Sequence, residues 1–225
     1  MILQALTLTL KLAFVVSLIL LLFGMPLAYW LAFSRKRWKF FVEAIVSLPI
    51  VLPPTVLGFY VLVAIGPATP VGRIYRALTG HALAFTFEGL IVGSVLYSLP
   101  FAVQPMETAF AAVDRKLLGA SALLGASQWR SFWRIVLPLG LPGVLTGFVL
   151  SFAHTLGEFG VVLMIGGNIP GATRTISILI FDQVEALDYA AANQTALLLL
   201  AFCFLLLAAL YGLRGRAVWN LWGWK

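Results

Sequence analysis

Residues 117–143 read LLGASALLGASQWRSFWRIVLPLGLPG and form a polar, basic island within a strongly apolar sequence. Residues 115–124 carry apolar and small side chains at helical spacing, and Gly125 interrupts the pattern as a glycine at a helix end commonly does. Ser127 fits the N-cap of a second short helix over residues 128–136. The stretch therefore predicts two short helices with a glycine corner between them.

The residues around this corner predict a docking element at a membrane surface. Pro138 and Pro142 are expected to end the second helix before the next apolar run begins. Aromatic side chains and the cations Arg130 and Arg134 are expected to hold both helices at the membrane–water boundary.

The overall composition indicates an integral membrane protein. The chain has 225 residues, of which 62% are hydrophobic and 10% are charged, and its mean hydropathy is +1.03. Soluble domains carry about a quarter charged residues. The net charge of +7 comes from cations beside apolar runs, which indicates membrane topology rather than a nucleic acid partner. The single cysteine, Cys203, excludes an intrachain disulfide.

The apolar runs predict an all-α, polytopic bundle of five spans in one domain, with the lipid bilayer as its surroundings. The first run is expected to be a retained span, because it is too long for a signal peptide and its cations follow it. The alternative topology has six spans, in which the stretch around residues 173–181 crosses or re-enters the membrane. The five expected spans cover residues 12–33, 43–65, 90–110, 145–165 and 190–213.

The cations assign an orientation to these spans. The N-terminus is expected outside and the C-terminus in the cytoplasm, with a cytoplasmic loop over residues 111–138 and outside loops over residues 66–89 and 166–189. Four cations then lie outside: Lys11, Arg73, Arg76 and Arg174. Eleven lie inside: Arg35, Lys36, Arg37, Lys39, Arg115, Lys116, Arg130, Arg134, Arg214, Arg216 and Lys225.

The second expected span contains three prolines, Pro49, Pro53 and Pro54, followed by Thr55. Proline removes a backbone donor, so this helix is expected to be kinked or interrupted. The interruption has two interpretations, namely an ordinary kink packed against neighbouring helices or a broken helix beside a translocation path or gate.

The fourth expected span contains the most costly polar residues, His154 and Glu158. Their spacing of four predicts one shared helix face, where they would pair with each other or with neighbouring helices in a structural role. The alternative is a catalytic or metal-binding pair, against which stands the absence of a third ligand or a nucleophile motif in the sequence.

The spacing in the first stretch resembles a family signature, the cytoplasmic EAA loop of the permease subunits of ABC importers. That signature is Glu-Ala-Ala, three residues, Gly, nine residues, Ile, one residue and Leu-Pro. Gly125, Ile135 and Leu137–Pro138 stand at the matching positions. Gly119, Ala120 and Ser121 stand where Glu-Ala-Ala would be, so the glutamate is missing.

Three further stretches, in the family's order, resemble the molybdate permease of ABC importers: LPIVLPPTVLGF at 48–59, LGEFG at 156–160 and IPGATRTI at 169–176. Tungstate and sulfate permeases are close relatives, so the choice of oxyanion stays open at this point. The residues expected to couple the loop to an ATPase are Leu117, Leu118, Gly119, Ala120, Ser121, Leu123, Gly125, Ile135, Leu137 and Pro138.

The resemblance implies a multi-pass subunit of a bacterial or archaeal inner membrane with the type I importer fold. It implies a homodimer, two cytoplasmic ATPase subunits and an external substrate-binding protein, with no cofactor. The sequence has no GxxxxGK[ST] phosphate loop, so ATP hydrolysis is expected in a partner subunit. Without the glutamate, docking is expected to depend on shape and on Leu117, Leu118 and Leu123. An intramembrane enzyme centred on His154 and Glu158, or a passive channel, is the alternative from a different class.

Overall fold

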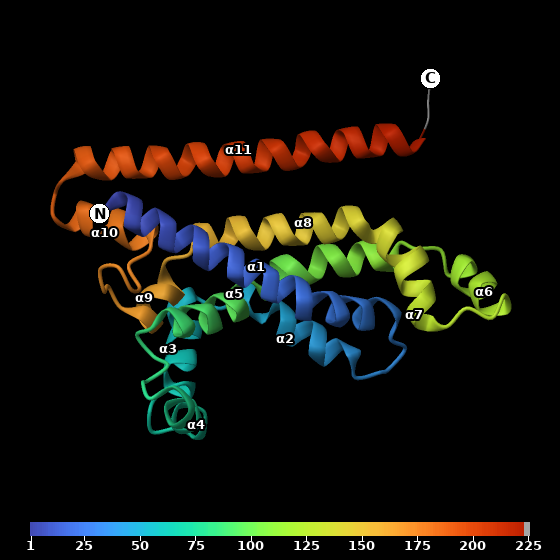
Figure 1. Cartoon of the computed structure of the whole chain (residues 1–225), viewed down its shortest axis with the longest axis horizontal. Helices are drawn as coiled ribbons and strands as arrows, with labels where there is room; N and C mark the ends of the chain where they lie inside the picture. Colours follow the sequence, from blue (N-terminus) through green and yellow to red (C-terminus); the bar gives the residue numbers. More distant parts are fainter. Residues whose placement is uncertain (223–225) are drawn as a thin grey trace.

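The computed structural model describes the backbone of residues 1–222. Every regular element in that part of the chain is a helix, which confirms the predicted all-α class. Three long helices form the centre of an elongated bundle: α1 (Ile2–Phe33), α5 (Phe87–Ala111) and α8 (Leu137–Leu156), which all contact one another (Figure 1). Their shared core buries Leu12, Val16, Leu20, Val103, Met106 and Phe110 completely or nearly so.

The helix α1 begins ten residues before the predicted span. Polar residues in its first turns do not stop it, because threonine hydroxyls can donate to the carbonyl four residues earlier. Thr7 donates to the Leu3 carbonyl and Thr9 to the Ala5 carbonyl, each at 2.7 Å. The helix therefore extends past the apolar run that sequence hydropathy detects.

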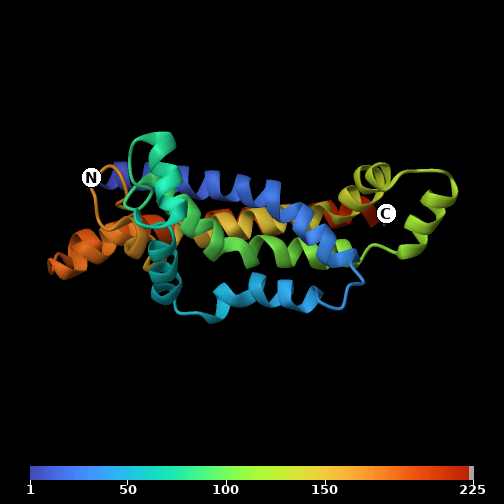
Figure 2. The ribbon, with the colours of Figure 1, turned by 90° about the horizontal axis from the view of Figure 1, so that it is seen from below.

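The second predicted span is interrupted, as its prolines indicate. α2 (Lys39–Val51) and α3 (Pro54–Ala64) meet at a bend of 116°. Leu52 and Pro53 between them are extended, with ψ angles of 137° and 135°. Proline disfavours helical geometry in the preceding residue, so the consecutive prolines end α2. Figure 2 shows α3 turning across the bundle after α2 has run beside it.

The fourth predicted span, residues 145–165, is wrong as a single helix, because the helix is interrupted within it. α8 ends at Leu156, and a short helix, α9 (Gly160–Gly166), follows after three residues. Phe159 departs from helical geometry, with φ −129° and ψ −60°. The two glycines that flank Glu158 and Phe159 lower helix propensity at this break.

The expected stop at Pro138 and Pro142 is also wrong. α7 (Gln128–Ser131) passes through a π-helical turn, η1 (Phe132–Val136), directly into α8. The Leu137 N–H donates to the Phe132 carbonyl, five residues back. The turn widens the helix just before Pro138, which gives the proline ring room, whereas Pro142 is simply accommodated inside α8.

Both predicted outside loops contain helices that hydropathy does not reveal. α4 (Pro70–Thr79) begins at Thr69, whose hydroxyl accepts from the Gly72 N–H. α10 (Ile176–Glu185) overlaps the stretch around residues 173–181 that the six-span alternative invokes. Ten residues are too few to cross a bilayer. Within the described residues four helices are long and apolar enough to cross, or five if α2 and α3 count as one broken span.

The last helix, α11 (Tyr189–Trp222), runs along the outside of the bundle and contacts α10 and α8 (Figure 1). Most of its crossing segment faces away from the rest of the chain. Lys225, one of the cations expected inside, lies outside the described residues, as do the side chains of Arg214 and Arg216.

Candidate functional site

The loop between α5 and α8 has the two-helix shape that its sequence predicts. α6 (Arg115–Leu123) starts at Asp114, whose carboxylate accepts from the Lys116 N–H at 2.8 Å. Gly125 forms the corner with φ +77°, a left-handed conformation that favours glycine. A hydrogen bond of 2.7 Å between the hydroxyls of Ser121 and Ser131 ties α6 to α7. The loop is therefore a defined structure rather than a flexible connection.

The predicted coupling residues divide into an anchored set and an exposed set. Leu118, Ile135 and Leu137 pack against the hydrophobic core. Leu117 and Leu123 face solvent, and Leu123 is 91% exposed. Leu124, which sequence reasoning did not single out, is 88% exposed beside it. The two neighbouring leucines at the end of α6 thus form an apolar surface that the rest of the described chain leaves uncovered.

Aromatic side chains fix the loop to the transmembrane helices. Phe132 lies edge-on against Tyr29 of α1, with 5.1 Å between ring centroids, and against Phe110 of α5, with 6.2 Å between centroids. Edge-to-face pairs at these distances are favourable beyond their buried area. Phe132, directly after α7, thus joins the loop to the ends of α1 and α5.

A second candidate site lies where the two broken helices meet. α3 and α9 pack so closely that an added Cβ at Gly58 would lie 2.8 Å from the Met164 Cβ, and one at Gly160 would lie 2.7 Å from the Pro54 Cβ. A cavity of about 570 Å³ adjoins this contact, and its lining includes Pro54, Thr55, Tyr97, His154, Glu158 and Phe159.

The predicted path residues are only partly brought together. Pro54 and Thr55 line the cavity, whereas Pro49 is buried within α2 and Pro53 lies in the bend without lining it. Two of the four predicted path residues thus lie beside His154 and Glu158 of the fourth predicted span. Sequence reasoning missed Gly58 and Gly160, although small residues are a known signal of close helix packing in membranes.

Of the two structural arrangements expected for His154 and Glu158, pairing with each other is not found, whereas His154 contacts a neighbouring helix. α8 ends between them, so they do not share a helix face. Nδ1 of His154 is 2.9 Å from the Ser98 hydroxyl, and its ring stacks on Phe101 at 3.9 Å. These contacts support the structural role predicted for His154.

Glu158 differs from His154 because its carboxyl makes no hydrogen bond of acceptable geometry within the described residues, although the buried Ser94 hydroxyl lies nearby. It is 3% exposed, and among the described residues neither carboxyl oxygen has a hydrogen-bond partner. A buried polar group in this state is costly and calls for an explanation. The described residues contain no cluster of three His, Cys, Asp or Glu side chains that could hold a metal ion.

Comparisons with known proteins agree on one family. Residues 24–218 match the model of the family described as "Binding-protein-dependent transport system inner membrane component". The "Molybdenum transport system permease protein ModB" of Azotobacter vinelandii is 52% identical over 212 residues, which cover 94% of each chain.

Solved structures share the fold at low sequence identity. One is described as "Inward facing conformations of the MetNI methionine ABC transporter", with a TM-score of 0.72, 20% identity, and coverage of 96% of this chain and 95% of the other. Another is a "bacterial alginate ABC transporter in complex with alginate pentasaccharide-bound periplasmic protein", with a TM-score of 0.72, 20% identity, and coverage of 96% and 78%.

Proposed function

Because this chain belongs to the family of binding-protein-dependent transport system inner membrane components, we infer that it is the transmembrane permease subunit of an ATP-driven ABC importer for molybdate. Identity of 52% across nearly the whole of both chains carries the choice of molybdate. The protein is a translocation subunit of the inner membrane, and a separate subunit hydrolyses ATP. The interpretations as an intramembrane enzyme or a passive channel are set aside.

The loop formed by α6 and α7 is the proposed contact with the cytoplasmic ATPase. Leu117, Leu123 and Leu124 are exposed, whereas Phe132 binds the loop to α1 and α5. Gly119 stands where the family signature has glutamate, so the loop offers no carboxylate there. Its apolar surface is then the main feature that a groove of the ATPase can contact. This arrangement, exposed at its tip and anchored at its base, is the single structural observation that supports coupling.

An ABC importer also has an external binding protein, and the family description and the alginate transporter complex both support one here. We further propose a homodimer with two ATPase subunits. The largely uncovered face of α11 and the many exposed apolar side chains of α2 and α3 leave room for lipid and for a second copy.

We propose that α3 and α9 form the gate of the translocation path. Both follow a break in a transmembrane segment, and Gly58 and Gly160 let them pack as one unit. Pro54 and Thr55 lie beside the cavity that Glu158 also lines. Rocking of this unit about its two breaks would open and close the path, as discontinuous helices do in other transporters.

The test is ATP hydrolysis by the reconstituted importer. The permease, its ATPase and its binding protein are assembled in vesicles, and hydrolysis is measured with molybdate, tungstate or sulfate on the binding protein. Stimulation by molybdate with accumulation inside the vesicles is expected. Equal or greater stimulation by sulfate would contradict the assigned cargo, and hydrolysis without accumulation would contradict the permease role.

The proposed orientation has its own test. Single cysteines at Lys36, Thr79, Gln128 and Asn168 are introduced into a Cys203→Ser background and labelled with a reagent that does not cross the membrane. We expect Thr79 and Asn168 to label from outside, and Lys36 and Gln128 to label only after permeabilisation, because the cations concentrate on the latter side. Labelling of Lys36 and Asn168 from the same side would contradict five spans.

A further inference from the structure

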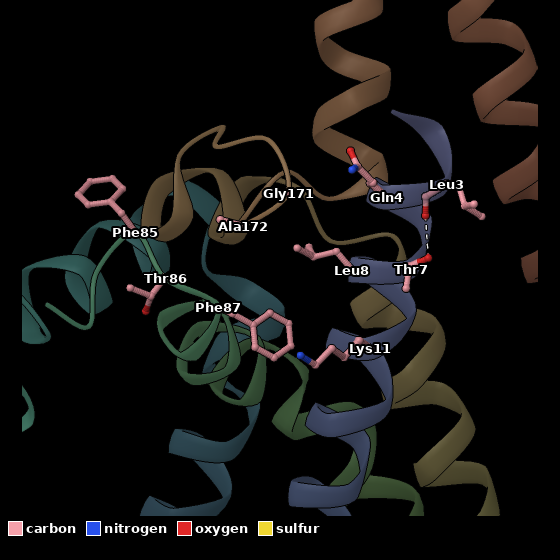
Figure 3. A pocket seen from close by; sticks show the side chains of 10 residues that line it. All are labelled: Leu3, Gln4, Thr7, Leu8, Lys11, Phe85, Thr86, Phe87, Gly171 and Ala172. Atoms are coloured by element: carbon pink, nitrogen blue, oxygen red, sulfur yellow. Dashed lines mark hydrogen bonds between the residues drawn. The ribbon is translucent and has the colours of Figure 1, made fainter. Parts of the chain in front are cut away.

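A groove lies at the end of the bundle opposite α6 and α7. Its volume is about 610 Å³, and it opens between the first turns of α1, the start of α5 and the loop before α10 (Figure 3). Most of its lining is apolar, including Leu3, Leu8 and Phe87. The groove is thus separate from the coupling loop and from the α3–α9 contact.

One cation points into this groove. The Lys11 ammonium lies 4.6 Å from the centroid of the Phe87 ring, and Figure 3 shows the two side chains facing each other. Among the described residues no carboxylate lies within ion-pair distance of Lys11, whereas Arg174 on the nearby loop pairs with Asp182 at 3.4 Å. The positive charge of Lys11 therefore remains available to an incoming anion.

The depth of Lys11 places the groove at the membrane surface. Lys11 and Phe33, at the other end of α1, are 22 residues apart, or about 33 Å along a helix, which is close to the thickness of the hydrocarbon layer. Leu3, Gln4 and Thr7 therefore extend beyond that layer toward the aqueous side. At this level the groove is accessible to a soluble protein that docks on the membrane surface.

An exposed aromatic residue at the edge of the groove is held in a strained backbone conformation. Phe85 has φ +62°, and its N–H donates to the Ile165 carbonyl at 2.9 Å. Its side chain is 51% exposed although it lines the groove. Strain at a non-glycine residue concentrates at functional sites. Exposed rigid aromatic residues are also frequent anchors of protein interfaces.

We propose that this groove binds an acidic side chain on the surface of the external binding protein, with Lys11 as the ion-pair partner and Phe85 as the apolar contact. The inference rests on the proposed function, because it takes the binding protein from there. The groove offers one unpaired cation within apolar walls, so charge complementarity favours an acidic group on the partner. The position of the groove, at the end away from α6 and α7, fits a partner on the outside.

The experiment titrates molybdate-loaded binding protein into the complex of permease and ATPase in nanodiscs and measures ATP hydrolysis. The variants are Lys11→Glu, Lys11→Arg and Phe85→Ala, with Arg73→Glu on α4 as a charge-matched control away from the groove. Hydrolysis without binding protein reports whether each variant is folded and assembled. A parallel titration uses nanodiscs with and without the anionic lipid phosphatidylglycerol.

Lys11→Glu is expected to raise the half-maximal binding-protein concentration by at least about tenfold, because it places like charges together. Lys11→Arg and Arg73→Glu should stay near the wild type, Phe85→Ala should weaken binding, and high salt should reduce the Lys11→Glu difference. An unchanged half-maximal concentration for Lys11→Glu would overturn the inference, as would an effect only on lipid dependence. If binding protein does not stimulate the wild type, the proposed function itself fails.

Discussion

Gly125 in the proposed coupling loop and Gly160 at the start of α9, in the proposed gate, are restricted for opposite reasons. A Cβ at Gly125 would meet nothing within 4 Å, but the backbone there has φ +77°. At Gly160 a Cβ would lie 2.7 Å from the Pro54 Cβ. One glycine is required by its conformation and the other by its neighbour, so the two regions should respond differently to the same substitution.

The largest effect is expected at the α3–α9 contact. Gly160→Ala pushes α9 away from Pro54, at a cost of about 1–3 kcal/mol for overpacking, and should abolish most molybdate uptake into vesicles. Gly157→Ala is the matched control in the same break, because a Cβ there meets no atom closer than 3.9 Å. Equal uptake by both variants would show that α3 and α9 need not pack closely.

The next effect is expected at the corner of the coupling loop. Gly125→Val places a β-branched residue in a left-handed conformation, which costs about 1–2 kcal/mol, while the spans stay inserted. Binding to the ATPase should weaken and stimulated hydrolysis should fall. Asparagine tolerates this conformation better, so Gly125→Asn should retain more of both. Normal co-purification and hydrolysis for Gly125→Val would mean that the corner does not couple the subunits.

A smaller effect is expected at Glu158. Glu158→Gln keeps size and polarity and should preserve much of the transport. Glu158→Leu removes a buried carboxyl that has no hydrogen-bond partner among the described residues, so the amount of folded protein should not fall. Uptake by the leucine variant should nevertheless decrease, because the side chain lines the cavity beside Thr55. Normal folding with no transport by Glu158→Gln would show that the carboxyl itself is required.

The smallest effect is expected at Gly119, which is helical and has open space around it. Gly119→Ala should stabilise α6 by about 1 kcal/mol through helix propensity and leave stimulated hydrolysis unchanged. The helicity of a peptide spanning α6 checks the expected stabilisation, and the hydrolysis assay checks that coupling is unchanged. Loss of coupling in this variant would mean that the ATPase approaches the α6 backbone at this position.

Local patterns in the sequence predict those features that depend on neighbouring residues. The break at Pro53–Pro54, the helix α6 and the corner at Gly125 follow from proline and glycine chemistry, and the structure confirms them. The five-span estimate agrees with the four or five crossing helices found in the described residues. The orientation and the coupling role of the loop remain predictions.

Features that a search for apolar runs does not detect, or that depend on contacts between distant segments, could not be predicted. Hydropathy does not distinguish residues inside α8 from those in the break after Leu156, so the sequence pattern puts His154 and Glu158 on one face. The close approach of Gly58 to Met164 joins segments about a hundred residues apart. The helix α4 escapes a search for apolar runs because polar and charged residues alternate with its apolar ones, although Thr69 and Gly80 mark its two ends.

The π-helical turn over Phe132–Val136 has a consequence for rotational phase. An α-helix turns by about 100° per residue. A π turn accommodates one extra residue without interrupting the helix. Removing one residue here would restore ordinary winding with little rotation, because the wider turn has already absorbed that residue. Winding the same residues as an ordinary α-helix would instead rotate α6 and Leu123 about the axis of α8 by roughly the angle of one residue. Every span would remain, yet the exposed leucines would face a new direction. The π turn therefore sets the direction in which the permease presents its contact surface.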